Sequence, residues 1–279
     1  MSEAMPRRSM EPLMLKVLSI AFTVFIVAYI LIPILVTLVM SFNDAAMIRF
    51  PISVWSLKWY QEFFASPQWT DALMNSIVIA IGTALISTSS GILAAWAFER
   101  FNIPFKDVWY LLIMLPLFMP GVVLGLGVAI AFGGLQIGDY SIYGSRELVM
   151  IAHSLWAMPL VFMLMEATFR MIDYRVVEAS YDLGGKPVGT FFEIVIPMVS
   201  TGIISSALFA FVISLNEFVM ALFLTDRDTQ TLPVLMWLSL RSAGTPRLAV
   251  ASVILALTVF ACLTVIMIWY VRQLRKVAK

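Results

Sequence analysis

Charged residues divide this chain into long uncharged segments. Six segments lack Asp, Glu, Lys and Arg and are rich in apolar side chains: residues 17–43, 72–98, 108–138, 148–165, 194–216 and 248–271. A helix rises about 1.5 Å per residue, so about 20 residues cross the roughly 30 Å hydrocarbon core of a bilayer. The pattern predicts an all-α polytopic membrane protein, a single domain over residues 1–279. Its six transmembrane helices are expected near residues 17–41, 72–98, 108–134, 148–168, 198–224 and 248–271.

Two other interpretations of these apolar segments do not fit. Buried strands run about 4 to 8 residues, and strands of a membrane barrel alternate polar and apolar residues over about 10. The first segment has the basic flank of a signal peptide, Arg7, Arg8 and Lys16. Its apolar run is too long, however, and no small-residue cleavage site closes it. We therefore expect a retained first helix.

The basic residues indicate how the six helices are oriented. An even number of spans places both termini on one side, and cytoplasmic segments carry an excess of Lys and Arg. With the N-terminus inside, twelve of the 18 Lys and Arg residues fall in cytoplasmic segments and the other six in external ones. This asymmetry predicts a cytoplasmic tail over residues 1–16 and two cytoplasmic termini.

The composition narrows the class of protein further. Apolar residues make up 61% of the chain and charged residues 13%, against about half and about a quarter in an ordinary soluble domain. These values exclude a soluble enzyme, a disordered chain and a collagen. The net charge of +1 gives no basic field for nucleic acid. Because the chain has one cysteine, Cys262, and one histidine, His153, we expect no disulfide framework, no metal site and no cofactor.

Two connections between the predicted spans are long. The external residues 44–71 are rich in aromatic side chains, which favours a short helix at the membrane interface over a ligand site. In the cytoplasmic residues 170–193, a helix-forming run up to Leu183 is followed by Gly184 and Gly185. Glycine readily takes the left-handed conformation that ends a helix. A short amphipathic helix of this kind suits insertion into a groove on a partner.

The cytoplasmic loop carries a spaced motif. Glu178-Ala179-Ser180 is followed after three residues by Gly184, after nine more by Ile194, and then by Ile196-Pro197. The pattern resembles the Glu-Ala-Ala motif of permease subunits of bacterial ABC importers, with Ser180 in place of the last alanine and Ile196 in place of leucine. The resemblance implies the type I ABC importer permease architecture and a cytoplasmic coupling loop over residues 170–197. The residues it assigns to coupling with an ATPase subunit are Glu178, Ala179, Ser180, Asp182, Gly184 and Pro197.

The resemblance also implies the partners. They are an ATP-binding cassette ATPase dimer, a second permease subunit that is a related but different chain, a periplasmic substrate-binding protein and the lipid of the bacterial inner membrane. The chain has no phosphate-binding loop of its own, because Pro187 follows Gly185-Lys186 where Ser or Thr would bind the metal. We therefore expect the chain not to be an enzyme, with ATP hydrolysis on a separate subunit.

Further segments resemble the spermidine/putrescine group of permeases, whose members handle amines, opines and aminophosphonates. These segments are Ser41-Phe42-Asn43, Lys58-Trp59-Tyr60, the stretch from Pro116 to Pro120, Ala152-His153-Ser154, Ser214-Leu215-Asn216-Glu217 and Thr231-Leu232-Pro233. The polyamine members carry two acidic residues where this chain has Asn216-Glu217, and a dication would favour two carboxylates. The implied substrate is a small amine-bearing solute, such as a polyamine, an opine or a similar molecule.

An ionisable residue inside a span usually faces the bundle interior or an aqueous path. Glu217 is such a residue, and on a continuous helix it shares a small, partly polar face with Ser206, Ala210, Ser214 and Ala221. We expect the translocation path to be lined by Glu217, Asn216, Ser214 and His153. The alternative for Glu217 is a hydrogen bond between helices. His153 lies at a similar depth, and the favoured partner of its ring is a backbone carbonyl.

Other residues are expected to be structural: Gly121, Gly125 and Gly127 for close helix approach, Pro116 and Pro120 for a kink or a helix start, and Glu166 with Arg170 as an i,i+4 ion pair. The competing function is a proton-coupled secondary transporter. That class needs coupling carboxylates near the midplane, broken spans and usually an internal repeat, and it would leave the cytoplasmic motif unexplained. A membrane enzyme would need a metal cluster or a Ser-His-Asp set, and neither is apparent within the spans.

Overall fold

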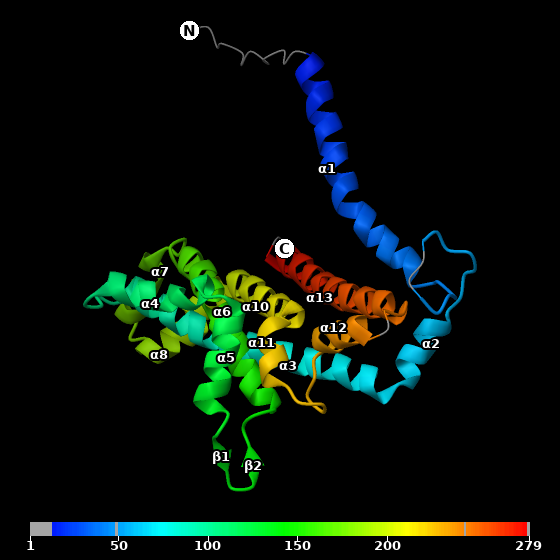
Figure 1. The fold of residues 1–279 in the computed structure, drawn as a ribbon. Helices are drawn as coiled ribbons and strands as arrows, with labels where there is room; N and C mark the ends of the chain where they lie inside the picture. Colours follow the sequence, from blue (N-terminus) through cyan, green and yellow to red (C-terminus); the bar gives the residue numbers. More distant parts are fainter. Residues whose placement is uncertain (1–12, 48–49, 243, 278–279) are drawn as a thin grey trace.

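The computed structural model describes residues 13–47, 50–242 and 244–277. This part of the chain is helical apart from its loops and one small hairpin (Figure 1). The elements are α1 Leu13–Met40, α2 Lys58–Ala65, α3 Pro67–Arg100, α4 Lys106–Phe118, α5 Gly121–Phe132, β1 Gln136–Ile137, β2 Tyr140–Ser141, α6 Arg146–Phe169, α7 Tyr174–Asp182, α8 Pro187–Thr190, the π-helical turn η1 Phe191–Val195, α9 Ile196–Met198, α10 Ser200–Asn216, α11 Val219–Leu224, α12 Leu232–Ser242 and α13 Arg247–Val277. The two strands pair antiparallel.

Four of the described helices are long and apolar enough to cross a membrane, namely α1, α3, α6 and α13. They coincide with the predicted spans near residues 17–41, 72–98, 148–168 and 248–271. Two bent pairs add further candidates: α4 with α5, at 103°, and the segment from Pro187 to Met198 with α10, at 75°. The described residues thus supply up to six spans, and the all-α polytopic fold is confirmed.

The third predicted span, near residues 108–134, consists of two helices. Pro116 lies inside α4, and Pro120 immediately precedes α5. Proline lacks an N–H group and its ring clashes with the preceding helical turn. The expectation that these prolines kink or start a helix is confirmed.

The fifth predicted span, near residues 198–224, is also broken. The helix α10 ends at Asn216, Glu217 has an extended backbone (φ −72°, ψ 124°), and α11 begins at Val219. The prediction of one continuous helical face that joins Ser214, Glu217 and Ala221 is therefore wrong. The chain changes direction at the glutamate, so residues on either side of it belong to different helices.

The helices α3, α6 and α10 pack together at the centre of the molecule. Small residues permit their close approach, since a Cβ atom added to Gly91 of α3 would lie 2.6 Å from Val161 Cγ1 of α6. Phe98, Phe162 and Phe169 fill the core toward one end of this bundle. Apolar packing of this kind, with hydroxyl side chains interspersed, is typical of helices in lipid.

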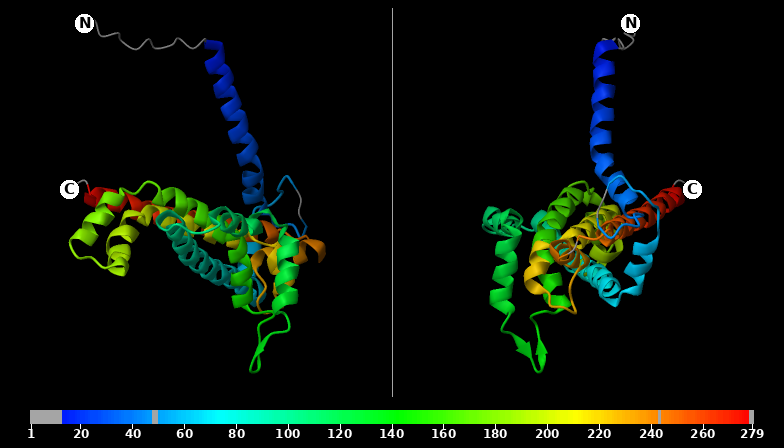
Figure 2. Two further views of the ribbon diagram at one scale, coloured as in Figure 1. Left: turned by 90° about the vertical axis from the view of Figure 1, so that its left-hand side faces the viewer. Right: turned by 45° about the vertical axis from the view of Figure 1, so that its right-hand side comes forward.

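The helix α1 stands apart from this bundle (Figures 1 and 2). None of its most apolar 18-residue window is buried, and α1 packs against α13. A helix that is apolar on all sides must be covered by lipid or by another protein. Residues 1–12 of the predicted cytoplasmic tail lie outside the described residues.

The predicted helix in residues 44–71 is present as α2. Trp59 and Phe63 of α2 are buried and pack with Trp69 of α3. The hydroxyl groups of Tyr60 and Ser41 are 2.8 Å apart and hydrogen-bonded. These contacts attach the end of α1 to the start of α3.

Candidate functional site

The helix expected in the cytoplasmic loop is α7. Asp173 caps its start, because the backbone N–H of Arg175 donates to Asp173 Oδ1 at 3.1 Å. At its end, Gly184 adopts φ +87°, and the N–H of Gly185 donates to the carbonyl of Ser180 at 2.8 Å. This backbone arrangement is the left-handed helix ending that glycine favours. The predicted helix and its predicted stop are both confirmed.

Side chains fix α7 to the membrane helices. Val177 is buried, and the ring of Tyr174 stacks on Trp96 of α3 at 6.3 Å between centroids. The hydroxyl groups of Ser180 and Thr190 are 2.9 Å apart, so they join α7 to α8. Ser180, where the family motif has alanine, therefore makes a hydrogen bond that alanine could not make.

The outer surface of this loop is open to a partner. Of the six residues predicted to couple to an ATPase, five are exposed and Ser180 is half-buried; the exposed ones are Glu178, Ala179, Asp182, Gly184 and Pro197. Leu183, Val188 and Phe192 are also exposed, at 90%, 69% and 62%. Large apolar side chains left uncovered beside charged ones are typical of a protein–protein contact.

Ion pairs flank the loop. Arg170 donates to Glu166 at 2.6 Å, which confirms the expected pair, and also to Glu99 of α3 at 2.9 Å. The hydrogen bond to Glu99 raises the pKa of the Arg170 guanidinium. Hydrogen bonds from Arg175 lower the pKa of the Asp173 carboxyl. The base of α6 is thereby tied to α3 at the point where the loop begins.

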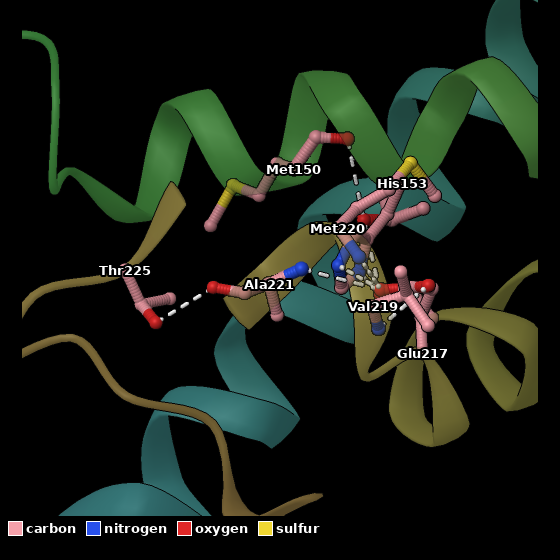
Figure 3. A network of polar contacts seen from close by, with 9 residues as sticks. Met150, His153, Glu217, Val219, Met220, Ala221 and Thr225 are labelled. Atoms are coloured by element: carbon pink, nitrogen blue, oxygen red, sulfur yellow. Dashed lines mark hydrogen bonds and ion pairs between the residues drawn. The ribbon is translucent and has the colours of Figure 1, made fainter. Parts of the chain in front are cut away.

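Glu217 caps the short helix α11 (Figure 3). Its Oε1 accepts from the N–H of Val219 at 3.0 Å, and its Oε2 accepts from those of Met220 and Ala221 at 2.9 and 3.3 Å. The first N–H groups of a helix lack partners within the helix, and a carboxylate at that end satisfies them and the helix dipole. Glu217 itself is 5% exposed.

His153 of α6 lies against this cap (Figure 3). Its Nδ1 is 2.8 Å from Ser214 Oγ, and its Nε2 is 3.4 Å from Glu217 Oε2. Ser214 Oγ in turn lies 3.1 Å from Thr83 Oγ1 of α3, which lies 3.4 Å from the carbonyl of Met150. His153 and Thr83 are fully buried. The expected backbone-carbonyl partner for His153 is wrong, because side chains of α10 and Glu217 surround the ring instead.

The break between α4 and α5 lies next to the break between α10 and α11. Trp156 of α6 donates from Nε1 to the carbonyl of Met119 at 3.3 Å. A Cβ atom added to Gly121 would lie 3.4 Å from Trp156, 3.4 Å from Val219 and 3.6 Å from Glu217 Oε1. His153 and Trp156, three residues apart on α6, therefore contact both breaks.

The predicted role of the α5 glycines is confirmed at two positions. At Gly125 an added Cβ atom would lie 3.0 Å from Met220 Cα of α11, and Gly121 is similarly close to Val219. At Gly127, no atom of the described residues lies within 4 Å of an added Cβ atom, so the prediction that Gly127 allows another helix to approach closely is wrong.

Asn216 faces away from this buried network. It is exposed, and it lines a cavity of about 750 Å³ between α1, α12, α13 and the end of α10. Phe218 and Trp237 also line the cavity, with their rings 5.5 Å apart. Of the four residues predicted for the path, the structure thus groups His153, Ser214 and Glu217, whereas Asn216 lines the cavity instead.

Several partners of this site are not predicted by the sequence. Thr83 and Trp156 contact the two breaks, and Glu99 completes the ion pairs of Arg170. A hydroxyl residue within an apolar helix and a tryptophan one turn from the histidine were weak signals for the first two. Among the described residues, no group of three or more His, Cys, Asp or Glu side chains could hold a metal ion.

Comparison with known proteins gives consistent results. Residues 87–279 match the family model described as "Binding-protein-dependent transport system inner membrane component". The chain is 31% identical over 227 residues to the putrescine transport system permease protein PotI of Escherichia coli, covering 80% of each chain. It is 26% identical over 244 residues to the spermidine/putrescine transport system permease protein PotC of Haemophilus influenzae, covering 85% of this chain and 91% of that one.

A solved structure has the same fold. One chain of a bacterial ABC transporter involved in the import of the acidic polysaccharide alginate superposes with a TM-score of 0.72 at 14% identity, covering 95% of this chain and 96% of that chain. This similarity confirms the type I ABC importer permease architecture that the sequence motif implied.

Proposed function

The chain belongs to the family of inner membrane components of binding-protein-dependent transport systems, and we propose that it forms half of the translocation path for a small amine-bearing solute. It is a permease subunit of an ABC importer. In this proposal it does not hydrolyse ATP itself, and an ATP-binding cassette ATPase dimer drives transport.

The cytoplasmic loop carries this proposal. A coupling element must be rigidly attached to the membrane helices and open to its partner, so that movement of one is transmitted to the other. The α7 segment meets both conditions, because Val177 and Tyr174 fix it to the bundle while Leu183 and Glu178 face outward. A proton-coupled secondary transporter also has broken spans, but it has no use for such a loop.

The apolar helix α1 supports the partner assignment. The exposed side chains of α1 would be covered by lipid and by a second permease subunit, which is a related but different chain. A periplasmic substrate-binding protein would deliver the solute on the external side. We place the complex in the bacterial inner membrane with both termini of this chain cytoplasmic, on the strength of the basic residues.

The solute assignment rests on the relatives and on the α10–α11 break. PotI and PotC are named as putrescine and spermidine/putrescine permeases. We propose that the path runs beside the break, with Asn216 toward the solute and Glu217, Ser214 and His153 behind it. The solute in this proposal is a polyamine, an opine or a similar amine.

Purification of the importer tests the proposal. A tagged chain, co-expressed with the subunits encoded beside it, should bring down an ATPase and a second permease. In vesicles, the complex should hydrolyse ATP faster when the loaded binding protein is added, whereas the chain alone should not hydrolyse ATP. Uptake by the chain alone, driven by a proton gradient, would contradict it. Screening amines for binding to the substrate-binding protein that is encoded beside this chain identifies the solute.

A further inference from the structure

Glu217 has no free oxygen to offer a passing solute. Its two carboxylate oxygens accept three backbone N–H groups of α11, and the residue is 5% exposed. Its Oε1 lies 3.6 Å from the position of a Cβ atom added to Gly121 of α5, and its Oε2 lies 3.4 Å from His153. The carboxylate is therefore enclosed by protein on the sides described above.

The hydrogen-bond chain beside it fixes the direction of each donor. The carbonyl of Met150 can only accept, so Thr83 donates to it across 3.4 Å. Thr83 Oγ1 is then free to accept from Ser214, and the hydroxyl of Ser214 is used as that donor. Ser214 Oγ must consequently accept from His153, which places a hydrogen on Nδ1.

The other ring nitrogen then faces a carboxylate. Nε2 makes no hydrogen bond among the described residues but lies 3.4 Å from Glu217 Oε2, so without a hydrogen it would place a second acceptor beside the carboxylate in a buried site. Three N–H donors stabilise the charged form of the carboxylate, so the proton between them belongs on the nitrogen. A buried charge persists only when it is paired in this way.

We propose that His153 and Glu217 form a buried imidazolium–carboxylate pair that holds the α10–α11 break, and that both are positioning residues for transport. The pair anchors the start of α11 to α6. Because α5 packs against α11 through Gly121 and Gly125, the position of both half-helices depends on it. The effect on transport rests on the proposed function, whereas the protonation of His153 does not.

The single histidine of the chain gives a direct measurement. Nitrogen-15 NMR of imidazole-labelled complex reports whether each ring nitrogen carries a proton, and a His153→Gln complex identifies which signals belong to this residue in the presence of partner subunits. We expect both nitrogens to be protonated in the parent. In Glu217→Gln we expect Nε2 to lose its proton while Nδ1 keeps its own. Glu147→Gln, an exposed change on the same helix, should leave the spectrum unaltered.

Turnover gives the second readout. Glu217→Gln weakens the cap of α11 and removes the charge beside His153, so it should lower the ATPase rate stimulated by the binding protein at least roughly tenfold. The double variant His153→Gln/Glu217→Gln should be no slower than Glu217→Gln, since partners in one network are not additive. Co-purification with the ATPase subunit controls for assembly.

A neutral His153 ring in the parent would overturn the proposal, and this spectrum does not require any variant to fold. So would an unchanged His153 spectrum in Glu217→Gln, or losses of turnover in the two single variants that multiply in the double variant. Should the complex lack binding-protein-stimulated ATPase activity altogether, the proposed function fails while the spectrum still decides the pair.

Discussion

A single methyl group placed between α5 and α11 tests how tightly the two half-helices are held together. Gly125→Ala adds a Cβ atom 3.0 Å from Met220 Cα and 3.3 Å from the ring of Phe223. The nearer atom belongs to the backbone of α11, whose start is fixed by Glu217, so it cannot rotate away. The neighbouring variant Gly127→Ala adds the same group to the same helix where nothing lies within 4 Å.

The two substitutions are expected to change the free energy of unfolding in opposite directions. Replacing glycine by alanine inside a helix stabilises it by about 0.5–1 kcal/mol, and we expect Gly127→Ala to show this gain. Overpacking typically costs about 1–3 kcal/mol. For Gly125→Ala the two effects together give a net loss of up to about 2.5 kcal/mol. The helices must separate by a few tenths of an ångström to admit the methyl group.

Thermal unfolding of the purified chain in detergent measures the difference. Gly125→Ala should unfold at a lower midpoint than the parent, and Gly127→Ala at the same or a higher one. In the assembled importer, Gly125→Ala should also slow ATP hydrolysis stimulated by the binding protein, because it displaces the α10–α11 break. Equal midpoints for the two variants would refute the reasoning, since they would mean that α5 and α11 have room between them.

Three further outcomes follow from the loop, the helix packing and the charges. Gly184→Asp should still co-purify with the ATPase but lose the ATP turnover stimulated by the binding protein. Gly184→Asn tolerates the φ of +87° equally but adds no charge, so it should lose less turnover. Identical losses in the two variants would assign the defect to the backbone. Gly91→Ala should destabilise the chain by about 1–3 kcal/mol in thermal unfolding, because its methyl group would lie 2.6 Å from Val161; an unchanged midpoint would contradict the packing of α3 on α6. A reporter that is active only in the periplasm should be inactive when fused to the C-terminus. High activity would show that the predicted topology is wrong.

Helices that are apolar along most of their length were predictable from the sequence. Long uncharged runs predict α1, α3, α6 and α13 to within about six residues at each end, because a span needs about 20 consecutive apolar residues. The helix α7 was equally predictable, since Gly184 ends it and this signal lies close by in the sequence. Both features depend only on residues close together in the chain.

The breaks were harder to infer. Pro120 indicates the break between α4 and α5, whereas the break between α10 and α11 occurs in an apolar run whose pattern predicts one helix. One signal was present: Asn216-Glu217 precedes Val219, and acidic residues favour the first turn of a helix. Within a run expected to form one helix, Glu217 is instead interpreted as an ionisable residue inside a span. His153, which lies against Glu217, and Thr83, which contacts Ser214, come from other helices and could not be assigned by spacing.

The position of the carboxylate bears on how such a permease can handle an amine. A charge that faced the path directly would attract an ammonium strongly in a medium of low dielectric constant, and the solute would then leave slowly. Here Glu217 accepts three backbone N–H groups, and in the proposed pair the imidazolium of His153 balances its charge. The exposed group at the break is the neutral amide of Asn216, beside the rings of Phe218 and Trp237. An amide and aromatic faces would bind a cation weakly enough to release it, so in the proposed path Asn216 would contact the solute while Glu217 holds the helix break.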